Sequence, residues 1–256
     1  MSDPVLQVSD LGVSFGGIVA VDKVSLTINR SEVVGVIGAN GAGKTTFVNM
    51  VTGWIRPSSG TIVVNGRNVA GLPPRAMARH GVTRSFQVPQ VFTSLTTLEN
   101  IVLAYGLAEN PALRLFSALS TPHRMSIAQA TLQRFALNRW AEHRVSELPQ
   151  GARKLLDIAM ALARKPELLL LDEPTSGVAR EEKFSLMEQV FDAIGDTRVT
   201  ILFVEHDMDV VTRYASRVVA FVQGQVVADG DCRSVLANKA VQEHIVGSTA
   251  PVAAPV

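Results

Sequence analysis

The sequence has a single cysteine, no long hydrophobic run and almost no net charge. Cys232 is the only cysteine among 256 residues, which excludes an intrachain disulfide and a thiolate zinc cluster and is typical of a reducing compartment. The formal net charge is +1. A charge so close to zero creates no overall field toward nucleic acid or anionic lipid, so we expect no nucleic-acid partner.

No apolar run approaches the roughly 20 residues that a membrane-spanning helix needs. The longest apolar runs, 33–37 and 168–171, have the length of strands. The first residues, 1–4, lack the basic and apolar regions of a signal peptide. We therefore expect any association with a membrane to come through a partner protein.

Hydrophobic patterning predicts an α/β protein. The composition, 47% hydrophobic and 18% charged, supports an ordinary globular core. Period-two alternation and short apolar runs indicate strands, and strands that alternate with helices after residue 165 imply a largely parallel sheet. The predicted strands cover residues 6–15, 24–28, 33–37, 60–66, 168–171, 200–204 and 217–222.

Helical periodicity dominates from about residue 75 to residue 164, where runs of β-branched residues disappear. This stretch separates the first group of strands from the second. The sequence therefore predicts an α/β core that is interrupted by a helical segment. The predicted helices cover residues 46–51, 125–137, 152–164, 181–194 and 208–214.

Residues 38–46 match the phosphate-loop pattern G-x-x-x-x-G-K-[ST] at every position. A predicted buried strand precedes them and a predicted helix follows, as the pattern requires. Glycines allow the backbone N–H groups to point at a polyphosphate, and the helix N-terminus adds partial positive charge. In this pattern Lys44 reaches the β- and γ-phosphates and Thr45 binds magnesium. The predicted nucleotide-binding residues are Gly38, Ala39, Asn40, Gly41, Ala42, Gly43, Lys44, Thr45 and Thr46.

Two carboxylates follow the predicted strand at 168–171. Asp172 and Glu173 stand at its C-terminal end, which is where ligands bind in doubly wound sheets. Asp172 suits a magnesium role, either direct or through water. Glu173 can orient and polarise the water that attacks a γ-phosphate. A solvated acidic turn is the alternative interpretation, and the phosphate loop in the same chain argues against it.

These two motifs, with a helical insertion between them, resemble the ATP-binding subunits of ABC transporters. The resemblance covers residues 5–247 and implies a P-loop NTPase fold, in which a mixed sheet has a parallel core and an N-terminal antiparallel part. It places the core at about 5–90 and 165–247 and an inserted helical sub-domain at about 91–164. Small residues and prolines predict a disordered tail at 248–256. The implied ligands are ATP and Mg2+.

Three further residues match motifs of that family. Phe15 stands where the family has an aromatic residue that stacks on adenine, and a place in the core is the alternative interpretation. Gln87 matches the Q-loop glutamine, and His206 matches the switch histidine at the γ-phosphate. The resemblance implies catalytic roles for Glu173 and His206, nucleotide contacts for Phe15 and Gln87, and a metal site of Thr45, Gln87 and Asp172.

The signature loop departs from the family sequence L-S-G-G-Q, whose N–H groups and serine bind the ATP of the opposite subunit. The corresponding residues after Leu148 are Pro149, Gln150, Gly151 and Ala152, so a hydroxyl and a backbone donor are lost at the proline. Gly151 and the dipole of the following helix remain.

A second departure is Ala179, where the family has the aspartate of the D-loop. One lost hydrogen bond to a charged phosphate is worth about 1.5–3 kcal/mol. We therefore expect the composite site covered by this signature loop to be impaired, unless Gln150 or Lys154 compensates. The site built on Glu173 is expected to remain hydrolytic if the signature loop of the partner subunit is intact.

Within the family, segments 15–22, 97–101, 223–230 and 243–247 resemble the branched-chain amino acid uptake group. This implies an ATPase that powers uptake of branched-chain or other small amino acids or amides. Two alternatives remain open. One is the ATPase of a lipid or lipopolysaccharide exporter, and the other is a catalytically silent ATP-binding interaction subunit.

The resemblance also implies partners and a location. The partners are a second ATP-binding subunit (the same chain or a related one), two membrane permease subunits and, indirectly, a substrate-binding protein. The chain would lie peripherally on the cytoplasmic face of the cell membrane. Residues 88–92 and Leu95 are candidates for the permease contact, with a buried loop as the alternative.

Two other classes of P-loop protein fit the sequence less well. A GTP-binding switch would need a guanine-reading N-K-x-D-like motif, and none is present. A small-molecule kinase would leave Gln87 and His206 unexplained, although Arg134, Arg139 and Arg144 imitate an arginine-rich lid.

Overall fold

The computed structural model describes residues 4–109, 120–195 and 197–246. Within these ranges the chain forms two compact units, one made of residues 4–80 with 200–246 and the other of residues 81–199. The predicted boundaries of the helical sub-domain, near 90 and 165, both fall inside the second unit. The predicted tail, 248–256, lies outside the described residues.

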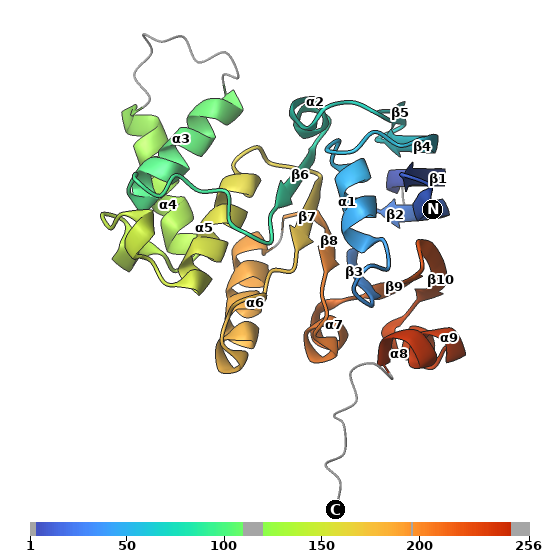
Figure 1. Ribbon diagram of the computed structural model, residues 1–256. Coiled ribbons are helices and arrows are strands. Elements are labelled where there is room, and N and C mark those ends of the chain that lie inside the picture. Colours follow the sequence, from blue (N-terminus) through green and yellow to red (C-terminus); the bar gives the residue numbers. More distant parts are fainter. Residues whose placement is uncertain (1–3, 110–119, 196, 247–256) are drawn as a thin grey trace, which may run out of the picture. The chain divides into compact units, whose positions relative to one another are not determined.

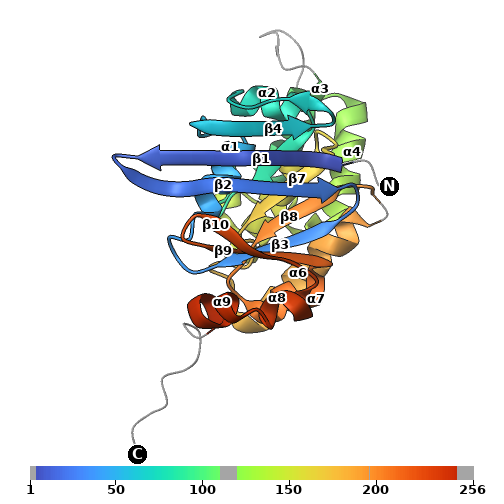
Figure 2. The same cartoon turned by 90° about the vertical axis from the view of Figure 1, so that its right-hand side faces the viewer.

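The first unit contains an antiparallel sheet built on two long strands, β1 (Pro4–Phe15) and β2 (Ile18–Asn29). Gly16 and Gly17 join them, both with positive φ, which suits a two-residue hairpin turn. β4 (Ser59–Val64) pairs with β1 and carries the short β5 (Arg67–Asn68) at its other edge. Figure 2 shows β1, β2 and β4 side by side.

A second group of strands in this unit positions the phosphate loop. β3 (Val33–Gly38) pairs in parallel with β8 (Thr200–Val204) and with β9 (Arg217–Val222), and β10 (Gln225–Gly230) pairs antiparallel with β9. β8 is buried along its whole length, as expected of a central parallel strand. The helical elements of the unit are α1 (Lys44–Val51), α2 (Pro74–Arg79), α7 (Met208–Tyr214), α8 (Cys232–Leu236), α9 (Lys239–Val241) and a π-helical turn (Gln242–Val246).

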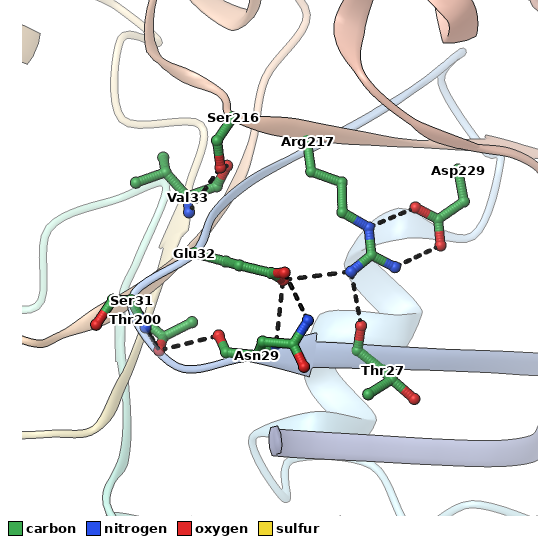
Figure 3. A network of polar contacts seen from close by, with 9 residues as sticks. All are labelled: Thr27, Asn29, Ser31, Glu32, Val33, Thr200, Ser216, Arg217 and Asp229. Atoms are coloured by element: carbon green, nitrogen blue, oxygen red, sulfur yellow. Dashed lines mark hydrogen bonds and ion pairs between the residues drawn. The ribbon is translucent and has the colours of Figure 1, made fainter. Parts of the chain in front are cut away.

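A polar network at Arg217 links these two groups of strands (Figure 3). The guanidinium donates to both carboxylate oxygens of Asp229 on β10, at 2.6 and 2.7 Å. Its Nη1 also donates to the Thr27 carbonyl of β2 at 2.9 Å and to Glu32 at 3.2 Å. The hydrogen bond with Asp229 raises the pKa of Arg217. Arg217 therefore fixes the end of β2 against β9 and β10 with charge-assisted bonds.

The second unit pairs two short parallel strands with a group of helices. β6 (Val82–Ser85) lies beside β7 (Leu168–Asp172), with Ser85 opposite Leu171. α3 (Thr97–Glu109) packs against α4 (Pro122–Arg134) and α5 (Gln150–Leu162), and α5 also contacts α6 (Arg180–Ile194) (Figure 1). Two 3-10 turns, Asn138–Trp140 and Val145–Glu147, join α4 to α5. Among the described residues, no helix is long and apolar enough to cross a membrane.

Several elements differ from the sequence-based expectation, and for β6 and α4 the physical reason is clear. β6 lies in the stretch expected to be helical, because four residues are too few to show period-two alternation and their pairing with β7 determines the conformation. α4 ends at Arg134 and not at residue 137. There Ala136 takes a positive φ of 52°, and the N–H of Leu137 donates to the Leu132 carbonyl, which closes the helix in a Schellman-type turn.

Candidate functional site

The phosphate loop runs from the end of β3 at Gly38 to the start of α1 at Lys44. The Lys44 side chain is buried, and its Nζ donates to the carbonyls of Gly38 at 2.7 Å and Ala39 at 3.0 Å. The loop therefore folds around a fixed positive charge. A fixed positive charge inside such a loop suits a polyphosphate, and the role of Lys44 at the phosphates stays a prediction.

The start of α1 adds to the positive potential. Phe47 N–H donates to the Gly43 carbonyl at 2.8 Å, so the N–H groups before it precede the helical ladder. The first turn of α1 contains no acidic residue. Thr45 is exposed beside the buried Lys44, and its role as a metal ligand stays a prediction. Backbone donors, helix dipole and lysine together favour a multiply charged anion.

Neighbouring strands hold the loop in place. Gly224, in the β9–β10 turn, donates its N–H to the Ala42 carbonyl at 2.9 Å and accepts from the Asp22 N–H of β2 at 2.9 Å. Gly43 has a φ of +99°, and a Cβ there would lie 2.5 Å from the Ala20 carbonyl oxygen. The close approach of β2 therefore requires glycine at position 43.

We expect Gly43→Ala to lower the free energy of unfolding by about 3 kcal/mol, from left-handed strain plus the clash with β2. Gly41→Ala is the matched control, since Gly41 also has a positive φ of 77° but an added Cβ would meet no atom within 4 Å. Gly41→Ala is expected to lower the free energy of unfolding by about 1 kcal/mol. Urea denaturation of both variants measures the difference, and equal losses would contradict this account of the loop.

His206 leaves the strands at the same edge as the phosphate loop. β3 and β8 are parallel, with Val36 opposite Val204. Gly38 lies two residues after Val36, and His206 lies two residues after Val204, so both stand at the same edge of the sheet. His206 is exposed, and its backbone N–H donates to the carboxylate of the buried Glu205. Phe15, at the end of β1, is 49% exposed and so does not lie in the core. Its stacking on adenine stays a prediction.

In the second unit, Gln87 and Glu173 come together as the pairing of β6 with β7 dictates. Each lies two residues beyond the opposed pair Ser85 and Leu171. The Gln87 Nε2 donates to the Glu173 carboxylate at 2.6 Å. Glu173 has a φ of +48°, a left-handed conformation that is uncommon for this residue type. An unusual backbone at this position is consistent with a functional site.

Asp172 is buried at the end of β7 and forms an ion pair with Arg84 of β6. The arginine compensates the negative charge of a carboxylate that would otherwise be costly to bury. Arg84 occupies one of the two carboxylate oxygens, Oδ2, and the metal role of Asp172 stays a prediction. Across the described ranges, no three or more His, Cys, Asp or Glu side chains gather in a group that could hold a metal by themselves.

The signature loop lies at the N-terminus of α5. Pro149 is the N-cap and Gln150 begins the helix, whose first turn contains no acidic residue. Pro149 and Gln150 are exposed. Lys154 is only 2% exposed and donates to two backbone carbonyls of its own unit, so it does not reach outward to compensate for the proline. Ala179 is exposed as the N-cap of α6.

Sequence reasoning missed Arg84 and Asp157 as functional candidates and misjudged Lys154. Asp157 is buried on α5, and that burial raises the pKa of its carboxyl, while hydrogen bonds from Ser85 and from the Gln90 and Phe86 N–H groups oppose the shift. The available signal was Asp157, a single charge within the apolar stretch 155–162 of this helix, with Lys154 directly before that stretch.

Comparison with known sequences identifies the family. Residues 21–176 match the family described as ABC transporter. The chain is 35% identical to the high-affinity branched-chain amino acid transport ATP-binding proteins LivG of Salmonella typhimurium and BraF of Pseudomonas aeruginosa. Both alignments extend over 257 residues and cover 96% of this chain and 99% of the relative.

Solved structures agree with the sequence comparison. A crystal structure of the ADP conformation of an ATP-binding cassette of an ABC transporter superimposes with a TM-score of 0.84 at 26% identity, covering 95% of this chain and 99% of that one. A nucleotide-free ATP-binding cassette from an ABC transporter gives 0.81 at 27% identity, with 94% and 98% covered. The predicted fold class, an α/β P-loop NTPase with a mixed sheet and an antiparallel part, is confirmed.

Proposed function

Since this chain belongs to the ABC transporter family, we propose that it is the ATPase subunit that powers uptake of branched-chain or other small amino acids or amides. Members of the family bind ATP and couple its hydrolysis to transport. The observation that carries the proposal is the phosphate loop, in which Lys44 is held by the Gly38 and Ala39 carbonyls at the N-terminus of α1.

ATP would bind with its phosphates along the loop from Gly38 to Thr46 and with adenine on Phe15. The exposed Thr45 hydroxyl and the Arg84-paired Asp172 fit Mg2+, which in nucleotide sites is bound through phosphates, water and one or two protein oxygens. Thr45, Gln87 and, through water, Asp172 would hold it. When bound, Mg2+ neutralises charge on the β- and γ-phosphate oxygens.

Hydrolysis would depend on Glu173. Its carboxylate would accept a proton from the attacking water as the oxygen approaches the γ-phosphate. Gln87 would orient that carboxylate through the hydrogen bond that links their side chains. His206 would donate to the γ-phosphate and thereby stabilise the charge that develops there. Lys44 and Glu173 are thus proposed to act on the same nucleotide.

A second ATP-binding subunit would complete the site. The signature loop, Pro149–Ala152, would place the N-terminus of α5 against the ATP of that partner. Pro149 offers neither hydroxyl nor N–H, and of the two candidates Gln150 and Lys154 only Gln150 could compensate, because Lys154 is turned inward. We propose that the site covered by this loop is the weaker of the two.

ABC transporter ATP-binding subunits work with permease components. We propose two permease subunits, with a substrate-binding protein acting through them, and a peripheral position on the cytoplasmic face of the membrane. Val88 and Phe92 support the permease contact, because they are 71% and 48% exposed and so do not belong to a buried loop.

Uptake of radiolabelled leucine by cells that lack the gene tests the proposal. We expect uptake to fall at least about 10-fold, because the proposed ATPase supplies the energy for transport. The wild-type gene should restore it, whereas a Glu173→Gln gene expressed at the same level should not. Excess unlabelled isoleucine, alanine or a short amide identifies the substrate range. Unchanged uptake of all of these, with altered lipopolysaccharide at the cell surface, would favour the exporter instead.

A further inference from the structure

Helix α5 carries two buried charged side chains that none of the motifs above includes. Lys154 and Asp157 stand three residues apart, on the same face of the helix, and are 2% and 5% exposed. Buried charges are retained at a cost unless hydrogen bonds compensate them. Their partners therefore indicate what the two side chains do.

Asp157 holds the backbone of the Q-loop. One carboxylate oxygen accepts from the Ser85 hydroxyl at 2.6 Å and from the Phe86 N–H at 3.0 Å. The other accepts from the Gln90 N–H at 2.9 Å. These three donors lie on both sides of Gln87, so a single carboxylate fixes the segment that presents the glutamine.

Lys154 connects the same segment to the end of β7. Its Nζ donates to the Gln87 carbonyl at 3.1 Å and to the Glu173 carbonyl at 2.8 Å. The latter carbonyl belongs to a residue with φ of +48°. Such a conformation persists only where surrounding contacts determine it, and a charge-assisted bond to its carbonyl is one such contact.

We propose that Lys154 and Asp157 are positioning residues that hold Gln87 and Glu173 in the geometry needed for hydrolysis. The inference rests on the proposed roles of those two residues. The hydrogen bonds described above join Lys154 and Asp157 to the backbone of residues 86–90 and 173 and to the Ser85 hydroxyl, so their proposed action on the reaction is indirect. A misplacement of about 1 Å in a catalytic group can lower a rate about 100-fold. Hydrogen bonds that fix the backbone at Gln87 and at Glu173 are therefore expected to affect the rate of turnover.

The prediction for Lys154→Met is a split between turnover and binding. Methionine keeps the length and apolar stem but donates no hydrogen bond, so we expect the kcat for ATP to fall by about 10- to 100-fold. The Kd for ATP should stay within about twofold, because Lys44 and the phosphate loop hold the nucleotide. Lys154→Arg keeps the donors and the charge, and its kcat should be intermediate.

Arg134→Met is the matched control. Arg134 is also a basic side chain of the second unit that donates to a backbone carbonyl, that of Ile194 at 3.3 Å, and this bond joins it to neither the Q-loop nor Glu173. Its kcat should stay within about twofold of wild type. A Lys154→Met variant that behaves like Arg134→Met would overturn the proposal.

Asp157 is tested by a change that alters only one atom. In Asp157→Asn, an NH2 group replaces one acceptor and faces a donor, so kcat should fall about 10-fold. Should either α5 variant fail to fold, Ser85→Ala decides the matter, since it removes a single hydrogen bond to Asp157. We expect kcat to fall about 2- to 10-fold with unchanged ATP affinity. An unchanged kcat would overturn the proposal.

Failure of this inference and failure of the proposed function are distinguishable in the same assay of the full chain. If Glu173→Gln abolishes hydrolysis while Lys154→Met and Ser85→Ala do not affect it, the proposed function is supported and the positioning role of Lys154 and Asp157 is wrong. If Glu173→Gln leaves hydrolysis intact, the proposed role of Glu173 is wrong, and the positioning role that depends on it is wrong as well.

Discussion

Replacement of Lys44 by alanine is expected to lower ATP hydrolysis by at least about 100-fold, the effect of removing one preorganised donor to a developing charge. The ammonium is the buried cation of the loop and donates to the Gly38 and Ala39 carbonyls. Its loss removes both the charge that is proposed to face the phosphates and two bonds that shape the loop. Affinity for ATP should fall as well, by at least about 10-fold.

Steady-state phosphate release and equilibrium dialysis with ATP measure the two effects. Lys44→Arg distinguishes the effect of the positive charge from that of side-chain geometry. It keeps the charge but places a planar guanidinium in a buried site that holds a single ammonium. We expect hydrolysis by this variant to be strongly reduced with partial retention of binding. ATP affinity unchanged in Lys44→Ala would contradict the assignment of the loop.

Glu173→Gln is expected to lower hydrolysis by about 100- to 10,000-fold while ATP still binds. The amide is isosteric and keeps an oxygen that can accept from the Gln87 Nε2, and the bond from Lys154 goes to the main chain and is unaffected. The capacity to take a proton from water is lost, whereas these two hydrogen bonds to residue 173 are kept.

Glu181→Gln provides the control, since Glu181 is an exposed carboxylate in the first turn of α6. It should hydrolyse ATP within about twofold of the wild-type rate. Turnover by Glu173→Gln at that same level would show that another group activates the water. The silent-subunit interpretation requires a wild-type chain that does not hydrolyse ATP even with its partner subunit.

The parts of the site that were predictable from sequence are the contiguous ones. The phosphate loop is a short pattern whose backbone geometry depends on its own glycines, and the apolar run before Asp172 marks a buried strand. The pairing of β6 with β7 then brings Gln87 to Glu173. Their roles at the nucleotide stay a prediction.

Contacts between distant segments were not predictable in the same way. Arg84 meets Asp172 across 88 positions, and Asp157 meets Phe86 across 71. No local pattern encodes such pairs, because they exist only after α5 and β7 have packed beside β6. The charges on α5 were visible in an apolar run, but whether they pointed inward or outward depended on that packing.

The central claim is that Lys44 and Glu173 act on the same ATP molecule, and a single-turnover experiment with prebound γ-labelled ATP tests it most directly. The account predicts that Glu173→Gln retains stoichiometric, uncleaved ATP after rapid removal of free nucleotide. It also predicts that adding Lys44→Ala abolishes this retention. Conversion of the bound ATP to ADP at the wild-type rate in Glu173→Gln, or full retention of ATP in the double variant, would contradict it.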